Sequence, residues 1–264
     1  MAKNSILKKI RKLAINIDWN LSFSGKSKGN KHLLRIVKIA KFLAQNVGAD
    51  VFIAEAGALL HDVALPSGND YNYKKNKIIA QEFLIRFKLS DLEINAIAEC
   101  VATHEGTVKP KTLEAKIVHD ADVLEKSGIL GIIRHTWKMT NSGRIDSEKI
   151  LKKDIKKIID HIKWRGKQLQ TPLAKKLHKC VSININIAQL RKIIPIISGL
   201  AKNSITTEDI AKIILKELKR NQRIALTRQL NLSYLASFKK YKFIDHSRLL
   251  TNKNANGKRY ANVP

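Results

Sequence analysis

The chain of 264 residues is poor in cysteine, apolar runs and acidic side chains, and each shortage limits what the protein can be. Two cysteines, Cys100 and Cys180, are too few for a disulfide framework, so we expect buried thiols in a reducing cytoplasm. No run of about 18 uncharged apolar residues occurs, so we expect no membrane-spanning helix. The N-terminal segment lacks the apolar core of a secretory signal. We therefore expect a cytoplasmic protein.

Acidic residues are scarce overall but are concentrated in one part of the chain. The 50 Lys and Arg residues outnumber 22 Asp and Glu residues, which gives a net charge of +28. Residues 32–140 carry 14 basic and 13 acidic side chains, whereas residues 1–31 carry 8 and 1. Residues 141–195 and residues 196–264 each carry 14 basic and 4 acidic side chains. A near-neutral segment between basic flanks indicates that a different chemistry operates there.

Proline and glycine are also few, at 5 and 12 residues, and apolar residues recur every three or four positions. This periodicity predicts an all-α fold. A broad apolar face predicts a buried helix over residues 31–47, ended by Gly48. Asp50 is expected to cap a second apolar helix that runs to Asp62. Further helices are predicted over residues 74–87, 90–104, 112–125 with a glycine-interrupted continuation to 139, 147–162, 172–182 and 207–218.

Of the five histidines in the near-neutral segment, four are close to a carboxylate or open a helix. Imidazole and carboxylate groups together are the ligand set of Zn, Mn, Fe or Mg, ions that suit phosphate chemistry. The relevant residues are His32, His61 followed by Asp62, His104 followed by Glu105, and His119 near Asp120 and Asp122.

The ordinary interpretation of a lone helical histidine is a surface residue or a satisfied core residue, and we accept it for His119. The His61-Asp62 pair differs because it directly follows an apolar helix, and burying an unpaired carboxylate costs several kcal/mol. Asp122 likewise lies among apolar residues. Two apolar helices that each deliver carboxylates inward are the arrangement that a metal site requires.

The order His32, His61-Asp62 and Asp122 resembles the HD-domain superfamily of metal-dependent phosphohydrolases. The segment from His32 to Ile36 is similar to the family's H-x-x-R-V motif, and Asp120 to Leu124 resembles a subgroup with a D-A-D-x-L segment. Some members of that subgroup are nucleotide pyrophosphohydrolases. The resemblance implies an HD-domain helical bundle with a basic helical C-terminal extension. Its expected divisions are a basic segment over 1–24, the HD domain over 25–195 and the extension over 196–264.

The resemblance also implies a set of site residues. A divalent ion (Mn, Mg, Fe, Ni, Co or Zn) is expected on His32, His61, Asp62 and Asp122, where it would activate water for attack on a phosphoester or phosphoanhydride. The expected catalytic or substrate-binding residues are His104, Arg35, Asp120 and Arg134. Within this set, Asp120 points about 200° away from Asp122 on a helix, which favours a structural duty. Arg134 has the alternative of a buried pair with Glu125 or Asp120.

Two positions depart from the subgroup pattern. Val123 stands where an arginine is usual, which removes a cation that would steady a carboxylate or a phosphate. Asn72-Tyr73 stands roughly where a His-Glu pair is usual, which removes ligands of a second metal. The departures favour a one-metal site.

The basic flanks have three interpretations: plain solvation, nucleic-acid binding, or attraction of an anionic nucleotide to a central site. The basic clusters are Lys152-Lys153, Lys156-Lys157 and the stretch 219–228, followed by aromatic residues from Tyr234 to Tyr260 that also fit core packing. Two functions therefore stay open. One is an enzyme acting on a nucleotide or another phosphorylated small molecule, and the other is a nucleic-acid-associated protein with a structural or regulatory HD core. The intact ligand set favours the enzyme.

Overall fold

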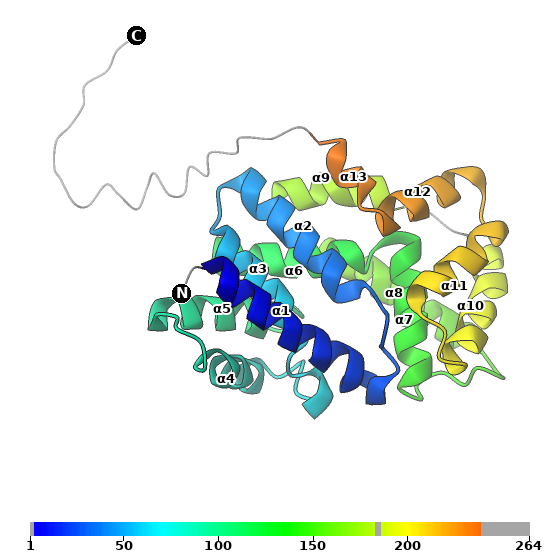
Figure 1. Ribbon diagram of the computed structural model, residues 1–264. Coiled ribbons are helices and arrows are strands. Elements are labelled where there is room, and N and C mark those ends of the chain that lie inside the picture. The colour runs from blue at the N-terminus through cyan, green and yellow to red at the C-terminus, as the bar shows by residue number, and fades with distance from the viewer. Residues whose placement is uncertain (1–2, 183–185, 239–264) are drawn as a thin grey trace, which may run out of the picture.

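The computed structural model describes residues 3–182 and 186–238, which form helices and no strand (Figure 1). The predicted all-α fold is confirmed, and no helix in these two ranges is long and apolar enough to cross a membrane. The α-helices are α1 (Lys3–Asn20), α2 (His32–Val47), α3 (Val51–Leu60), α4 (Tyr73–Leu84), α5 (Asp91–Thr103), α6 (Leu113–Glu125), α7 (Gly128–Asn141), α8 (Lys152–Lys167), α9 (Pro172–Val181), α10 (Ile187–Lys202), α11 (Thr207–Ile214), α12 (Arg220–Leu230) and α13 (Ser233–Ala236). Short 3₁₀ turns are η1 (Ser22–Gly25), η2 (Leu65–Ser67) and η3 (Leu215–Glu217).

The predicted helix ends around the histidine-rich segment are confirmed by their capping interactions. Gly48 ends α2 in the left-handed conformation with φ 75°, which glycine adopts without a steric penalty. The Asp50 carboxylate accepts hydrogen bonds from the amides of Phe52 and Ile53 and so begins α3. Ser90 and Glu93 form the reciprocal capping box that begins α5. These caps fix where the site residues at the helix ends are placed.

Four helices that the sequence did not predict individually, α1, α10, α12 and α13, are present. Helix α1 buries Ile6, Ile10 and Ala14, although its remaining positions are rich in lysine. Helix α10 contains Pro195, which removes one backbone hydrogen bond but does not end the helix because its apolar face is buried. Helix α8 begins later than predicted, at Lys152.

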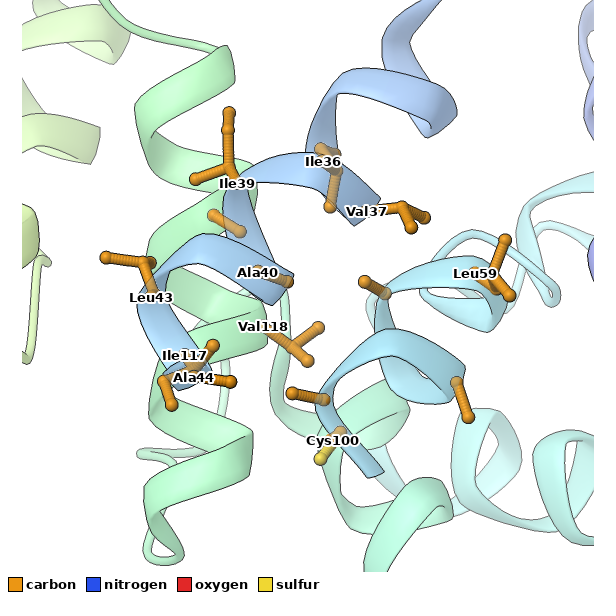
Figure 2. Close-up of a cluster of buried hydrophobic side chains, with 14 of the residues drawn as sticks. Ile36, Val37, Ile39, Ala40, Leu43, Ala44, Leu59, Cys100, Ile117 and Val118 are labelled. Carbon is orange, nitrogen blue, oxygen red and sulfur yellow. The ribbon is translucent and has the colours of Figure 1, made fainter. Parts of the chain in front are cut away.

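A first buried cluster holds together α1 to α6, α9 and α13. Figure 2 shows its centre, where α2 packs against α3 and α6 through side chains such as Ile36, Leu43 and Val118. Cys100 lies in this cluster, as predicted, whereas the expectation of a buried thiol is wrong for Cys180, which is exposed near the end of the amphipathic helix α9. The first cluster is the platform for the histidine-bearing helix ends.

A second buried cluster joins α7, α8, α10, α11 and α12. The predicted boundary between residues 195 and 196 falls inside α10, and the domain division stays a prediction. Gly128 connects the two clusters at the turn between α6 and α7. Its φ is +60°, and a Cβ there would lie 2.1 Å from the carbonyl oxygen of Val181, so the turn requires glycine.

The predicted core packing of the C-terminal aromatic residues is confirmed where the structure describes them. Tyr234 is buried in the first cluster and Phe238 packs against it. The other aromatic residues of that stretch, Tyr241, Phe243 and Tyr260, and the Asn- and Lys-rich tail from Thr251 lie outside the described residues.

Candidate metal centre

Two His-acid pairs end two different helices in the same way. His61 follows α3 and donates from Nδ1 to the carbonyl oxygen of Ala58 at 2.9 Å. His104 follows α5 and donates from Nδ1 to the carbonyl oxygen of Val101 at 2.7 Å. Because a carbonyl accepts only, Nδ1 carries the proton of each neutral ring and Nε2 is left as a ligand atom. Both Nε2 atoms face a shared, buried centre.

His32, the first residue of α2, is held at that centre by a carboxylate. Its Nδ1 lies 2.6 Å from Oε2 of Glu125, and this bond directs Nε2 inward. Burial lowers the pKa of His32 to about 3, so the ring is neutral and its Nε2 lone pair is available. A carboxylate that orients a histidine in this way is the usual outer support of a metal ligand.

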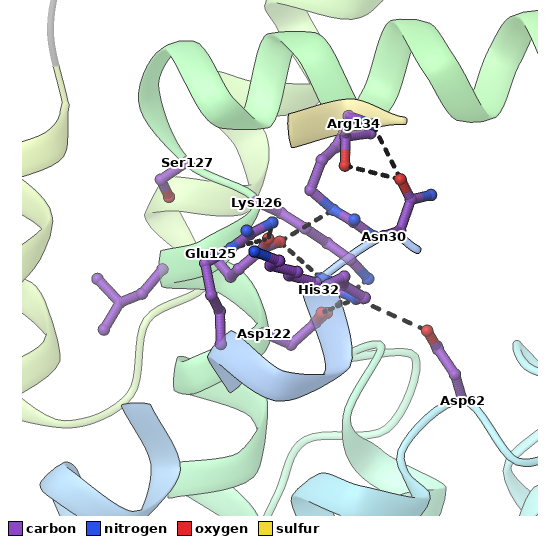
Figure 3. Close-up of polar contacts among 12 residues, drawn as sticks. Asn30, His32, Asp62, Asp122, Glu125, Lys126, Ser127 and Arg134 are labelled. Atoms are coloured by element: carbon purple, nitrogen blue, oxygen red, sulfur yellow. Dashed lines mark hydrogen bonds and ion pairs between the residues drawn. The ribbon is translucent and has the colours of Figure 1, made fainter. Parts of the chain in front are cut away.

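The first ligand group consists of His32, His61 and Asp122, whose ligand atoms lie within 4.8 Å of one another. Asp62 completes it, since Oδ2 of Asp62 lies 3.1 Å from Nε2 of His61 and 3.6 Å from Nε2 of His32. Figure 3 shows Asp62 and Asp122 approaching His32 from different sides. The structure therefore brings together all four predicted ligands, although Asp122 on α6 lies 60 residues after Asp62.

A second ligand group adjoins the first and consists of Asp62, Asp70, His104 and Glu105. Nε2 of His104 lies 3.6 Å from Oδ1 of Asp62, 3.6 Å from Oδ1 of Asp70 and 3.7 Å from Oε1 of Glu105. Asp62 thus belongs to both groups, with Oδ2 toward the first and Oδ1 toward the second. The predicted His104 lies here, whereas neither Asp70 nor Glu105 is among the predicted site residues.

The donor atoms of both groups fit a cation. Nε2 of His104, Oδ1 of Asp122 and both carboxylate oxygens of Asp70 are buried and have no hydrogen-bond partner among the described residues. Buried polar atoms without partners are rare because they lose the hydration that water provides. A divalent ion would satisfy these atoms, and imidazole with carboxylate suits Mn, Fe or Zn.

Two cations compensate the outward oxygens of the carboxylates. Nζ of Lys126 lies 2.8 Å from Oδ2 of Asp122 and 3.4 Å from Oε1 of Glu105. The guanidinium of Arg165 binds Glu105 and lies 3.6 Å from Oδ2 of Asp122. Burial alone would raise the pKa of Asp122, but Lys126 and then Arg165 lower it to about 2. The ligand carboxylate is therefore ionised at neutral pH.

These contacts account for the two departures from the subgroup pattern. Val123 supplies no cation, but Lys126, one turn further along α6, pairs with the site carboxylate. Asn72 caps α4 instead of providing a ligand, whereas Asp70, two residues earlier, is buried in the second group together with Glu105. Positions close to the two departures therefore carry a cation, Lys126, and a buried carboxylate, Asp70.

Glu125 positions the first ligand group through contacts with three side chains. Besides orienting His32, it accepts hydrogen bonds from Arg35, and Nε of Arg134 lies 2.9 Å from its Oε2. Arg35 also donates to Glu208 of α11 at 2.6 Å, so its guanidinium is buried between two carboxylates. It does not line the pocket that opens beside the ligand groups at Asp62. Arg134 forms the ion pair with Glu125 that was one of its two predicted roles. It also lines this pocket.

Asp120 points away from both ligand groups. It accepts hydrogen bonds from the amides of Gln170 and Thr171, each at 2.7 Å, and from the Thr171 hydroxyl at 2.6 Å. It thus fastens the beginning of α9 onto α6, which agrees with the structural alternative. His119 is buried, and its Nδ1 donates to the carbonyl oxygen of His104.

A pocket of about 320 Å³ opens beside the ligand groups, and Asp62 is part of its wall. Lys126, Arg134 and Arg165 make this wall cationic. His135 and His161 stack in parallel with ring centroids 3.9 Å apart, and burial lowers their pKa values to about 3 and about 4. The remaining lining includes the aromatic residues Phe23, Tyr71 and Trp137. The pocket therefore combines positive charge with flat neutral rings.

One more acid near the site escaped prediction. Asp18 of α1 lines a small cavity together with His61 and Asp62, and one of its carboxylate oxygens has no hydrogen-bond partner among the described residues. Burial raises its pKa to about 7. The only sequence signal for Asp18 is that it is the one acid among residues 1–31.

Residues 30–127 match the family model of the HD domain. Ribonuclease Y of Fusobacterium nucleatum is 33% identical over 96 residues, which are 36% of this chain and 18% of that protein. Ribonuclease Y of Thermoanaerobacter pseudethanolicus is 31% identical over 94 residues, again 36% of this chain and 18% of the relative. The chain thus matches less than a fifth of the length of these relatives.

Two solved structures extend the likeness beyond that segment. Bacillus subtilis YpgQ matches with a TM-score of 0.52 and 20% identity, over 77% of this chain and 97% of YpgQ. The structure of YpgQ in complex with ADP matches with a TM-score of 0.52 and 19% identity over the same shares. At this level of identity the likeness supports the fold.

Proposed function

We propose that this protein is a metal-dependent phosphohydrolase that acts on a nucleotide or a related phosphoester or phosphoanhydride. The observation that carries the proposal is the convergence of His32, His61, Asp62 and Asp122 beside a pocket with cationic and aromatic walls. The names of the relatives, which are a ribonuclease and a protein with an ADP complex, are consistent with a phosphorylated nucleoside as substrate.

In this proposal the four predicted residues hold one divalent ion, with Glu125 orienting His32. A bound divalent ion acidifies water and polarises a phosphoryl oxygen, so the reaction needs no protein nucleophile. Lys126 and Arg165 keep Asp122 and Glu105 ionised and add positive charge where the phosphate binds. Arg134 faces the pocket from α7 as a further phosphate contact.

The second ligand group favours a second ion, in contrast to the one-metal site that the sequence predicts. His104, Asp70 and Glu105 offer unpartnered or carboxylate atoms around one point, and Asp62 belongs to both groups. Without a second ion, burial opposes protonation of His104, but the carboxylates, Asp70 first, raise its pKa to about 9. A protonated His104 then forms an ion pair with Asp62, whose Oδ1 lies 3.6 Å from its Nε2.

The stacked imidazoles are assigned to the base of the nucleotide. His135 and His161 are neutral at physiological pH, so they present a flat surface without repelling or attracting charge. Trp137 and Phe23 line the same pocket. Phosphate at the cationic wall and the base at the aromatic wall together use both kinds of surface.

The test is release of phosphate or pyrophosphate from a panel of nucleoside mono-, di- and triphosphates with Mn²⁺ or Mg²⁺ present. We expect Asp62→Ala to lose bound metal and to lose roughly 10³-fold or more of the activity, because the ion supplies the chemistry. Asp91→Ala, an exposed acid on α5, is the matched control and should behave as the wild type. Retention of both metal and hydrolysis by Asp62→Ala contradicts the proposal.

A further inference from the structure

A groove separate from the candidate metal centre lies along α8 and the beginnings of α10 and α12, in the half of the molecule that also contains α7 and α11 (Figure 1). Its volume is about 620 Å³, roughly twice that of the pocket beside Asp62. None of its lining residues belongs to either ligand group. Its cationic lining residues are Lys152, Lys156, Lys163, Arg191 and Lys219.

The positive charge of this basic groove is largely uncompensated. Asp160 is the one carboxylate among the described residues that line it, and Asp160 pairs with Lys156 at 2.8 Å. The other four cations are exposed and make no ion pair within the described part of the chain. Cations gathered from three segments, distant in sequence, concentrate positive potential that a polyanion would neutralise.

The helix beginnings strengthen this potential. Helices α8, α10 and α12 all begin at the groove, and a helix N-terminus carries a partial positive charge. Acidic residues are favoured in a first turn, and α8 has Asp154 there, but α10 and α12 have none, and α12 begins at Arg220 directly after Lys219. A cation in such a place is repelled by the partial positive charge of the helix end, and a bound anion would offset that repulsion. The first turns of α10 and α12 thus lack the acidic residues that usually stabilise a helix beginning, which leaves their positive ends available to an anion.

The lining also indicates how a strand would be recognised. Gln189 and Gln222 donate side-chain hydrogen bonds to each other at 2.8 and 3.0 Å, so these two amides are occupied. No aromatic residue is among the described residues that line the groove, so it offers no stacking platform for bases. The exposed Lys and Arg side chains therefore favour contacts with the phosphate backbone, which carries no sequence information.

Helix α8 connects the groove to the pocket beside the metal centre. Lys163 and Ile159 line both the groove and an adjoining hollow of about 310 Å³, and Ile162 lines both that hollow and the pocket. His161 and Arg165 of the same helix face the pocket. A bound strand would thus pass over α8 and approach the ligand groups.

We propose that the basic groove of α8, α10 and α12 binds the phosphodiester backbone of single-stranded nucleic acid without sequence preference. This inference does not depend on the proposed hydrolysis, because binding is measured without metal. A nucleic-acid strand fits better than a mononucleotide, since the cations are distributed along one helix and two helix beginnings. RNA and DNA share this backbone, and the two strands are separate arms of the test.

The experiment is fluorescence anisotropy of a labelled 20-nucleotide RNA, and of the DNA of the same sequence, with the full chain in chelator at 50 to 200 mM salt. The groove variant is Lys152→Ala, Lys163→Ala and Arg191→Ala together. The control variant, Lys8→Ala, Arg11→Ala and Lys38→Ala, removes the same charge from exposed positions on α1 and α2. Thermal melting of all three proteins verifies that they are equally folded.

We expect the groove variant to bind about 10-fold or more weakly at low salt, and its slope of log K against log salt to shrink by about 2, since each single-strand phosphate contact contributes about 0.7. The control should change binding by less than about 3-fold. Equal losses in both variants would show that net charge alone attracts the strand and would overturn the proposal. A flat salt response of the wild type, or equally tight binding of a mononucleotide at the groove, overturns it as well.

Discussion

The two ligand groups share Asp62 but differ in how their other members are held. In the first group, Glu125 fixes His32 and Lys126 compensates Asp122, so the ligands are oriented and charge-balanced before any ion binds. In the second group, both carboxylate oxygens of Asp70 lack hydrogen-bond partners, and burial raises its pKa to about 6. The first group is therefore preorganised for an ion, whereas the second needs a proton or a cation to offset its charge.

The largest effect that separates the groups is expected from removing one histidine at a time. His61→Ala deletes a ligand of the first group and should reduce turnover roughly 10³-fold or more, because the activating ion is lost. His104→Ala deletes the corresponding residue of the second group and should cost about 10- to 100-fold, as expected for a supporting position. Turnover at saturating Mn²⁺ measures both. Equal losses would abolish the distinction between the groups.

A second effect concerns the stability of the metal-free protein. The pKa of Asp70 is about 6 when folded and 3.8 in the unfolded chain, so the folded state binds more protons between these values. The Asp70 carboxyl group therefore contributes to the free energy of unfolding at low pH, and this contribution is lost as the pH rises through about 6. The difference corresponds to a penalty on the order of 3 kcal/mol at pH 7 to 8.

Asp70→Asn should remove that penalty and stabilise the metal-free protein at pH 7 to 8, with little change near pH 4. Urea unfolding in chelator at several pH values measures the change. Asp91→Asn on the surface of α5 is the control and should leave the pH profile as it is. If Asp70→Asn destabilises the protein at pH 8, the carboxylate is better compensated than its contacts indicate.

The smallest effect tests the support of the first group from the other half of the molecule. Glu208 of α11 binds Arg35, which in turn binds Glu125 and so stabilises the carboxylate that orients His32. Glu208→Gln should cost about 1–3 kcal/mol of unfolding free energy, because it weakens a buried charged hydrogen bond. Glu217→Gln, at the last residue of η3 and outside this network, should be neutral. Chemical denaturation compares the two variants, and equal stabilities would show that Glu208 does not support the first ligand group.

The grouping of His61, Asp62 and Asp122 could be anticipated because these residues are recognisable locally, whereas their binding of a metal stays a prediction. His61 and Asp62 are adjacent after an apolar helix, and Asp122 lies within an apolar pattern, so burial of polar groups could be inferred from neighbours in the chain. Asp70 could not be found in the same way, since it lies in a loop beside Asn69 and only the fold brings it against His104. The caps and most helices were predictable for the same local reason.

Ion pairs differ in whether the sequence indicates them, because only pairs close in the chain leave a local pattern. Lys126 lies four residues after Asp122, a spacing that places the two side chains on one helix face, so this pair could have been predicted. Glu208 lies 173 residues from Arg35 and Arg165 lies 60 residues from Glu105, and no local pattern indicates either pair. Helix α10 was missed because Pro195 reads as a break, although burial of its apolar face maintains the helix.

The most direct measurement is the number of divalent ions bound by the purified protein, determined by metal analysis after equilibration with Mn²⁺ and repeated for Asp122→Ala and Asp70→Asn. The account predicts that the wild type binds at least one ion, that Asp70→Asn retains the tightly bound ion and lacks any weaker second one, and that Asp122→Ala loses the tight ion. Equal metal content in the wild type and Asp122→Ala would contradict the claim that His32, His61, Asp62 and Asp122 form the metal centre.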